Sequence, residues 1–177
     1  MKKLKNTILW VACFFAVPTV FAQSNPELSD PEVASVAVVA NQIDVSYAEI
    51  AKKKSKNVEV LKFAETMMND HNAVIGQAVA LAKKLGVTPK DNPVSQQLLA
   101  DAVTTKKSLN SKSGKAFDIA YADNEVAYHK AVISAVEDLL IPQTDNAELK
   151  DLLTSVVPVL KTHLGHAEMV QKMLNGK

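Results

Sequence analysis

The chain has 177 residues, with 20 basic and 19 acidic side chains and a formal net charge of only +1. Every basic residue is a lysine. A near-neutral chain without arginine argues against nucleic-acid binding, which needs a basic face. The length suits a single domain. Because Cys13 is the only cysteine, no disulfide can form within the chain.

Residues 1–22 have the parts of a secretory signal peptide. Three lysines precede an apolar run over 8–21, and Val20 and Ala22 stand at the −3 and −1 positions of a cleavage site. The alternatives are a membrane anchor, for which the run is short against a span of about 20 residues, and a lipoprotein modified at Cys13. We expect export to the periplasm as a soluble domain of about 155 residues, without a thiol. Loss of the three lysines changes the formal charge from +1 to −2.

The first two helices are marked by apolar residues at helical spacing and by their end signals. The first is expected over 31–54, with Asp30 as its N-cap and Pro31 at its first position. The second is expected over 58–85 and ends at Gly86, the residue type that most easily adopts the left-handed conformation after a helix.

Three further helical stretches follow. A shorter, weaker one covers 93–107, and a long one covers 115–140, where Ile141-Pro142 ends it. The last begins in the sequence Asp145-Asn146-Ala147-Glu148, which resembles a capping box. Pro158 lies inside it, which predicts either a kink or two helices that meet there.

The sequence predicts an all-α fold, because strand-like alternation is absent after the signal peptide. The simplest arrangement is a four-helix bundle in which the 93–107 helix forms a crossover between the second and third long helices. The domain is expected to span 31–177, after a short polar leader at 23–30.

Five polar residues interrupt the apolar stripes of the long helices: Asp44, His71, Glu125, His129 and His163. Asp44 and His71 should be level in an antiparallel hairpin, since their numbers sum to 115 and the turn lies near residue 57. If the crossover returns along the bundle, His71 and His129 lie at similar depths, because they follow Val58 and Lys115 by 13 and 14 residues. Across the last hairpin His163 is expected to be level with Asn124 or Glu125, one turn from His129. One layer of the bundle could therefore contain all five.

Two interpretations of this layer remain open. Imidazole and carboxylate together suit zinc, iron or manganese, and ligands that point into a helical bundle are a known way to build a metal site. The same residues could instead form a hydrogen-bonded network that only fixes helix register.

Neighbouring residues have supporting roles in the metal interpretation. Asp70 is expected either to orient His71 or a group on the 115–140 helix, or to be an exposed acid. Asp118 and Tyr121 are expected to hydrogen-bond to each other in the core. His166 is expected at the rim of the layer. The methionines at 67–68 are expected to fill the core, with copper(I) ligation as the less favoured role.

Three ordered motifs resemble the bacterial domain-of-unknown-function 4142 family, over about Pro31 to Leu174. They are Phe63-Ala64-x-x-Met67-x-x-Asp70-His71, Phe117-Asp118-x-Ala120-Tyr121 followed by His129, and Pro158-x-Leu160-x-x-His163-Leu164. The resemblance implies a ferritin-like bundle with a crossover and an exported protein. It implies no particular activity. In the family the acid of the first helix is usually Glu, and here it is Asp44.

Two functions are consistent with these residues. One is an exported helical bundle that binds a transition metal through the His/carboxylate layer. The other is a non-enzymatic envelope protein that binds a protein partner, with the histidines in a structural network. No nucleophile–base pattern or phosphate-binding glycine loop points to an enzyme.

Overall fold

The computed structural model describes residues 26–176, and the expected signal peptide lies outside this part of the chain. All secondary-structure elements of the described part are helices, which confirms the all-α prediction. Its main helices are α1 (Asp30–Lys54), α2 (Val58–Leu85), α3 (Pro93–Asn110), α4 (Gly114–Ala135) and α6 (Ala147–Leu174). Within residues 26–176, no helix combines the length and apolar character that crossing a membrane requires.

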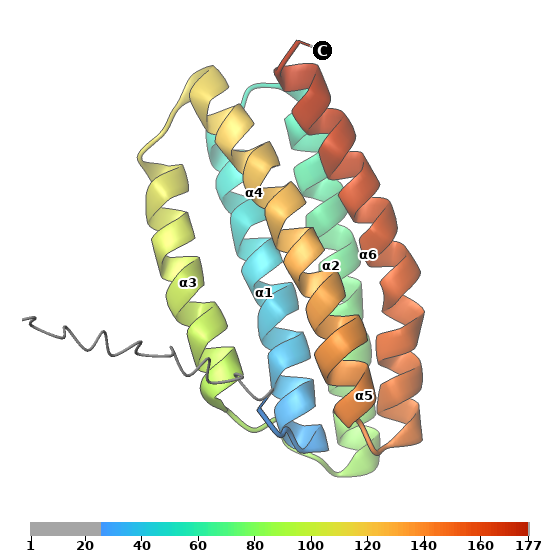
Figure 1. The fold of residues 1–177 in the computed structure, drawn as a ribbon. Helices are drawn as coiled ribbons and strands as arrows, with labels where there is room; N and C mark the ends of the chain where they lie inside the picture. Colours follow the sequence, from blue (N-terminus) through green and yellow to red (C-terminus); the bar gives the residue numbers. More distant parts are fainter. Residues whose placement is uncertain (1–25, 177) are drawn as a thin grey trace, which may run out of the picture.

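The long helices pack side by side as a bundle, with their ends at two opposite poles (Figure 1). The C-terminal pole carries Leu174 and the turn between α1 and α2, and the N-terminal pole carries Asp30 and the loop between α2 and α3. Helix α3 runs from the N-terminal pole back to the C-terminal pole. As a result α2 and α4 run in the same direction, as the crossover interpretation requires.

Helix α3 lies on the outside of the bundle, against α1. Its buried residues are Ser95, Ala102 and Leu109, which recur every seven positions and so form a narrow stripe. This explains the weak apolar pattern of the stretch.

The start of α1 differs by one residue from the prediction. Ser29, not Asp30, is the N-cap, and its backbone N–H and its hydroxyl both donate to the Glu32 carboxylate, at 3.0 and 2.7 Å. The Asp30 carboxylate instead accepts hydrogen bonds from the backbone N–H groups of Asp145 and Asn146, both at 2.9 Å. Asp30 therefore ties the start of α1 to the start of α6, whose N-cap is Asn146.

Of two prolines in the helical sequence, Pro142 acts differently from the expectation, and Pro158 follows one of its two alternatives. The third long helix does not stop at Ile141-Pro142, because a π-helical turn over Val136–Leu140 leads into a further helical turn, α5 (Ile141–Gln143). A proline is tolerated in the first turn of a helical segment, where its missing N–H needs no partner. Pro158 lies inside α6, which is one helix and not two.

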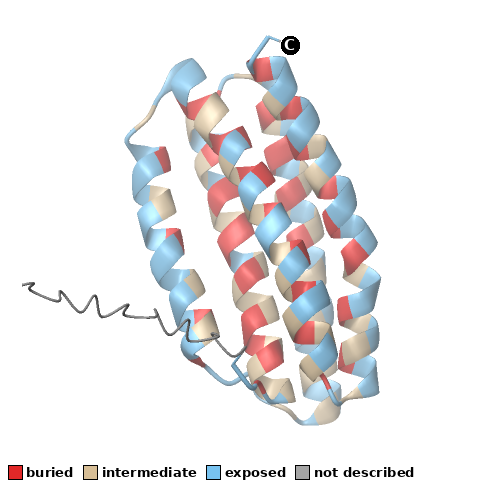
Figure 2. Ribbon diagram, in the orientation of Figure 1, coloured by how far each residue is buried: buried red, intermediate tan, exposed pale blue. Residues whose placement is uncertain are grey.

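The core is divided into two clusters along the bundle, and the buried residues face inward on every long helix (Figure 2). The cluster toward the C-terminal pole contains the aromatic residues Tyr47, Phe63, Phe117 and Tyr121, all at most 2% exposed. The cluster toward the N-terminal pole is aliphatic, and no buried residue of α2 belongs to it. Burial of side chains of this size stabilises a fold by about 1.5–3 kcal/mol each.

The expected hydrogen bond between Asp118 and Tyr121 is wrong. The Asp118 carboxylate accepts a hydrogen bond from the Ser55 hydroxyl at 2.6 Å, and no described group hydrogen-bonds to the Tyr121 hydroxyl. Ser55 lies in the turn between α1 and α2, so this buried contact ties the turn to α4. Asp118 and Tyr121 lie only three positions apart on α4, yet their polar groups do not meet.

Ser55→Ala should lower the free energy of unfolding by about 1–3 kcal/mol, because it leaves the buried Asp118 carboxylate without its donor. Urea unfolding followed by circular dichroism measures the change. The control is Ser108→Ala, at an exposed position of α3, which should change the free energy by less than about 0.5 kcal/mol. Equal effects of the two substitutions would contradict the structural role of the Ser55–Asp118 bond.

Candidate metal centre

Each long helix contributes to one polar layer between the two core clusters. Asp44 comes from α1, His71 from α2, Glu125 and His129 from α4, and His163 from α6, and none of the five is more than 4% exposed. The helical spacing that places apolar residues inward places these five inward as well. The structure therefore brings together all five residues that the sequence singled out.

The distances agree with the expectation that Asp44 and His71 lie at the same depth in the bundle. Nε2 of His71 lies 3.5 Å from Oδ2 of Asp44, so the two are level across the α1–α2 hairpin. The ring centroids of the three histidines are 5.7 Å (His71–His129), 5.2 Å (His71–His163) and 5.6 Å (His129–His163) apart. The three rings form a compact triangle.

The orientation of His71 is fixed from the outside of the layer. Nδ2 of Asn41 donates to the carbonyl of Ala37 at 2.8 Å, which turns Oδ1 of Asn41 toward His71. Nδ1 of His71 donates to that oxygen at 2.7 Å. A neutral imidazole carries one N–H, so Nε2 of His71 keeps its lone pair and faces the layer.

The other two histidines follow the same rule. Nδ1 of His129 donates to the backbone carbonyl of Glu125 at 2.9 Å, and Nε2 of His163 donates to the Asp70 carboxylate at 2.9 Å. Their remaining nitrogens, Nε2 of His129 and Nδ1 of His163, therefore carry the lone pairs. Metal-binding histidines commonly have this arrangement, in which an outer acceptor fixes the tautomer of the ring.

The inner atoms of the layer have no hydrogen-bond partner among the described residues. These atoms are Nε2 of His71, Nε2 of His129, Nδ1 of His163, and both carboxylate oxygens of Asp44 and of Glu125. The side-chain amide of Asn124 approaches Glu125 without meeting hydrogen-bond geometry. Buried polar groups are nearly always paired, and this concentration of unpaired acceptors is an arrangement that could hold a cation.

Burial also sets the charge state of these groups. Burial, with smaller contributions from the other two histidines, lowers the pKa of His71 to about 3. Burial likewise lowers the pKa of His129 to about 4. The imidazoles are thus neutral at physiological pH, which is the form that binds metals. Burial raises the pKa of both Asp44 and Glu125, since an ionised carboxylate here has no compensating positive charge.

The spacing of the inner atoms matches a coordination shell. Two ligand atoms bound at 2.0–2.2 Å to a tetrahedral ion lie about 3.4 Å apart. Oδ2 of Asp44 lies 3.5 Å from Nε2 of His71 and 3.7 Å from Nε2 of His129. Ligand atoms lie within 4.8 Å of one another in two overlapping groups, His71–His129–His163 and Asp44–Glu125–His129. Small side-chain adjustments would bring such atoms around one ion.

The residues around the layer are placed only partly as the sequence predicts. Asp70 is an orienting group, but it bonds to His163 on α6 and not to His71 or to α4. His166 lies outside the layer, with its ring 5.0 Å from that of Phe63. Met67 is fully buried in the core cluster toward the C-terminal pole, in agreement with a packing role.

Asn41 contacts the layer directly, but its position in the sequence did not single it out. It lies on α1, three positions before Asp44, so the two share a face of that helix. The numbers of Asn41 and His71 sum to 112, which places Asn41 about one turn from level with His71. Polar residues one turn from a buried histidine are therefore a usable signal for groups that orient it.

These observations define an all-helical bundle with a buried His/carboxylate cluster that could hold a metal ion. The family model for the domain of unknown function 4142 matches residues 16–170, and the chain belongs to that family. No curated protein and no solved structure matches the chain.

In metal-free protein, Glu125→Met should leave the free energy of unfolding unchanged or raise it by about 1 kcal/mol or more. The reason is that an apolar side chain of similar length replaces a buried carboxyl group that has no partner. Urea unfolding with a chelator present measures this, and Glu49→Met, at an exposed position of α1, is the matched control. A loss of more than about 2 kcal/mol would show that Glu125 is satisfied within the metal-free fold.

Proposed function

We propose that this protein binds a transition metal ion in the core of its bundle, through His71, His129, His163 and Asp44, with Glu125 adjoining. The observation that carries the proposal is the convergence of three histidine lone pairs whose other nitrogens are tied to outer acceptors. Zinc, iron and manganese suit this mixture of imidazole and carboxylate. The bound ion would supply the positive charge that the two buried carboxylates lack.

We further propose that the bundle is ferritin-like. Its support is the direction of the helices, since α3 returns the chain along the bundle and leaves α2 and α4 parallel (Figure 1). Ferritin-like folds have one such long connection and commonly bind metals in the bundle core. This chain has no Glu-x-x-His pair of the usual di-iron type; in place of it, three histidines meet two carboxylates. Fewer acidic ligands favour a single divalent ion over a pair.

The proposed location is the periplasm, after removal of residues 1–22. Support comes from the three-part pattern of the signal peptide. The mature chain would have no cysteine, so its metal ligands would not be lost to thiol oxidation.

A purely structural role for the histidines, in an envelope protein that binds a partner, has less support. Such a network would be satisfied internally, because an unpaired buried polar group costs about 1–3 kcal/mol. Here one nitrogen of each histidine and both carboxylates of the layer have no hydrogen-bond partner among the described residues.

Untagged protein purified from the periplasm should contain roughly one equivalent of zinc, iron or manganese per chain. His71→Ala and His129→Ala should each remove most of the metal, because each removes one of the converging lone pairs. Elemental analysis by plasma mass spectrometry measures the content. His166→Ala is the matched control, since this histidine packs on Phe63 outside the layer, and it should keep the metal. Equal and substoichiometric metal in all four proteins would refute the proposal.

Asp70→Asn should weaken metal binding about 10–100-fold, because the neutral amide orients and polarises the His163 ring less well than a carboxylate. Competition with a chromogenic chelator measures the affinity. Asp151→Asn, at an exposed position of α6, should leave the affinity unchanged. An unchanged metal affinity in the Asp70 variant would contradict a role of the Asp70–His163 hydrogen bond in metal binding.

A further inference from the structure

The inner face of α2 changes character at His71. Toward the C-terminal pole, Val60, Phe63, Ala64 and Met67 are 0% exposed. Beyond His71 the apolar stripe continues, yet none of its residues is buried. Residues Val74, Ala78 and Leu81 are among those left half-buried. The second half of α2 is therefore apolar but only partly covered, and Leu81 is its one residue that packs against the aliphatic core cluster.

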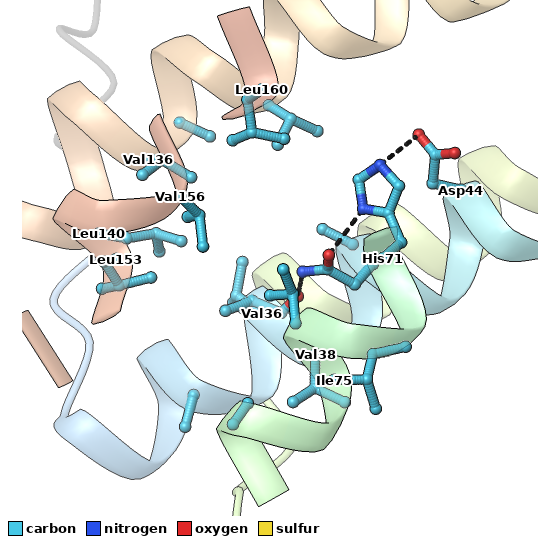
Figure 3. A pocket seen from close by; sticks show the side chains of 18 of the residues that line it. Val36, Val38, Asp44, His71, Ile75, Val136, Leu140, Leu153, Val156 and Leu160 are labelled. Carbon is cyan, nitrogen blue, oxygen red and sulfur yellow. Dashed lines mark hydrogen bonds and ion pairs between the residues drawn. The ribbon is translucent and has the colours of Figure 1, made fainter. Parts of the chain in front are cut away.

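A cavity of about 390 Å³ accounts for this difference. Its second wall consists of aliphatic side chains from the far side of the bundle, including Val136, Leu140, Leu153, Val156 and Leu160. Figure 3 shows these side chains facing Val36 and Ile75 across an open space. The volume lies within the range of small-molecule sites, about 300–1,000 Å³, and such sites are usually lined by apolar side chains.

One end of the cavity is polar, and it is the candidate metal centre. His71, His129, His163 and Asp44 all line the cavity, and Figure 3 shows His71 and Asp44 at its edge. A cavity that is apolar along its length and has candidate metal ligands at one end is complementary to a molecule with one long apolar part and one polar end.

The charges around the cavity restrict which polar group a bound molecule could carry. Among residues 26–176, no lysine lines the cavity, whereas Asp30, Asp70 and Asp101 do. An anionic head group would thus be repelled in metal-free protein, and the metal would be the one cation available to it. Iron and manganese also adopt five- and six-coordinate shells, which keep positions for an additional oxygen ligand beside four protein ligands.

We propose that the cavity binds a linear aliphatic carboxylate, with its chain between α2 and α6 and its carboxylate on the metal ion. This inference rests on the proposed metal site and adds the class of ligand to it. The chain would cover the half-exposed side chains of α2, which gains about 25 cal/mol for each Å² of apolar surface removed from water. The carboxylate would complete the shell of the ion.

Decanoate is the probe, titrated by calorimetry below its micelle concentration into metal-loaded and into chelator-treated protein. Ala78→Phe fills the cavity from α2 and Val156→Phe fills it from α6, so one variant remains informative if the other fails to fold. Neither position is a candidate metal ligand. Ala80→Phe is the matched control, because Ala80 lies on the exposed face of α2 and does not line the cavity. Metal content is measured on every sample.

Decanoate should bind the metal-loaded protein. Ala78→Phe or Val156→Phe should weaken its affinity at least about tenfold, and Ala80→Phe should leave the affinity unchanged. It should bind at least about tenfold more weakly without metal. Metal-loaded protein that does not bind decanoate overturns this inference and leaves the metal site intact. Binding that survives both cavity variants, or that is equal without metal, also overturns it. Protein that cannot be loaded with metal refutes the proposed function itself.

Discussion

The site depends on three hydrogen bonds that point away from it. His71, His129 and His163 each donate one N–H to an acceptor outside the layer, so each must present its other nitrogen to the inside. These bonds fix both the tautomer and the rotation of the rings. Burial keeps at least two of the rings neutral. The interior of the bundle is thus rich in electron pairs and poor in hydrogen-bond donors, which costs stability unless a cation binds there.

The two halves of the bundle have different tasks in this account. The half toward the C-terminal pole is densely packed with aromatic side chains and holds the helices at a fixed register. The other half is aliphatic, and its α2 wall is left open along the cavity. The His/carboxylate layer lies at the boundary. Its ligands are therefore positioned by a rigid core on one side, while the other side remains accessible to a further ligand.

The sequence predicts the helices, and the depth of each polar residue along the bundle, well. It predicts the contacts between particular side chains poorly. Periodicity and turn position are enough to level Asp44 with His71. They do not specify which helix lies beside which face, so Asp70 could not be assigned to His163 before the order of the helices was known. For the same reason the bond from Ser55 to Asp118 was missed. The cavity depends on how closely the side chains of several helices pack against one another, which no residue pattern encodes.

The central claim is that imidazole and carboxylate groups of this layer bind one metal ion. X-ray absorption spectroscopy of the metal-loaded protein tests it most directly. The account predicts nitrogen and oxygen ligands at about 2.0–2.2 Å with the outer-shell scattering of about three imidazoles, which His71→Ala would reduce. A shell that contains sulfur, or one made of oxygen alone without imidazole scattering, would contradict it.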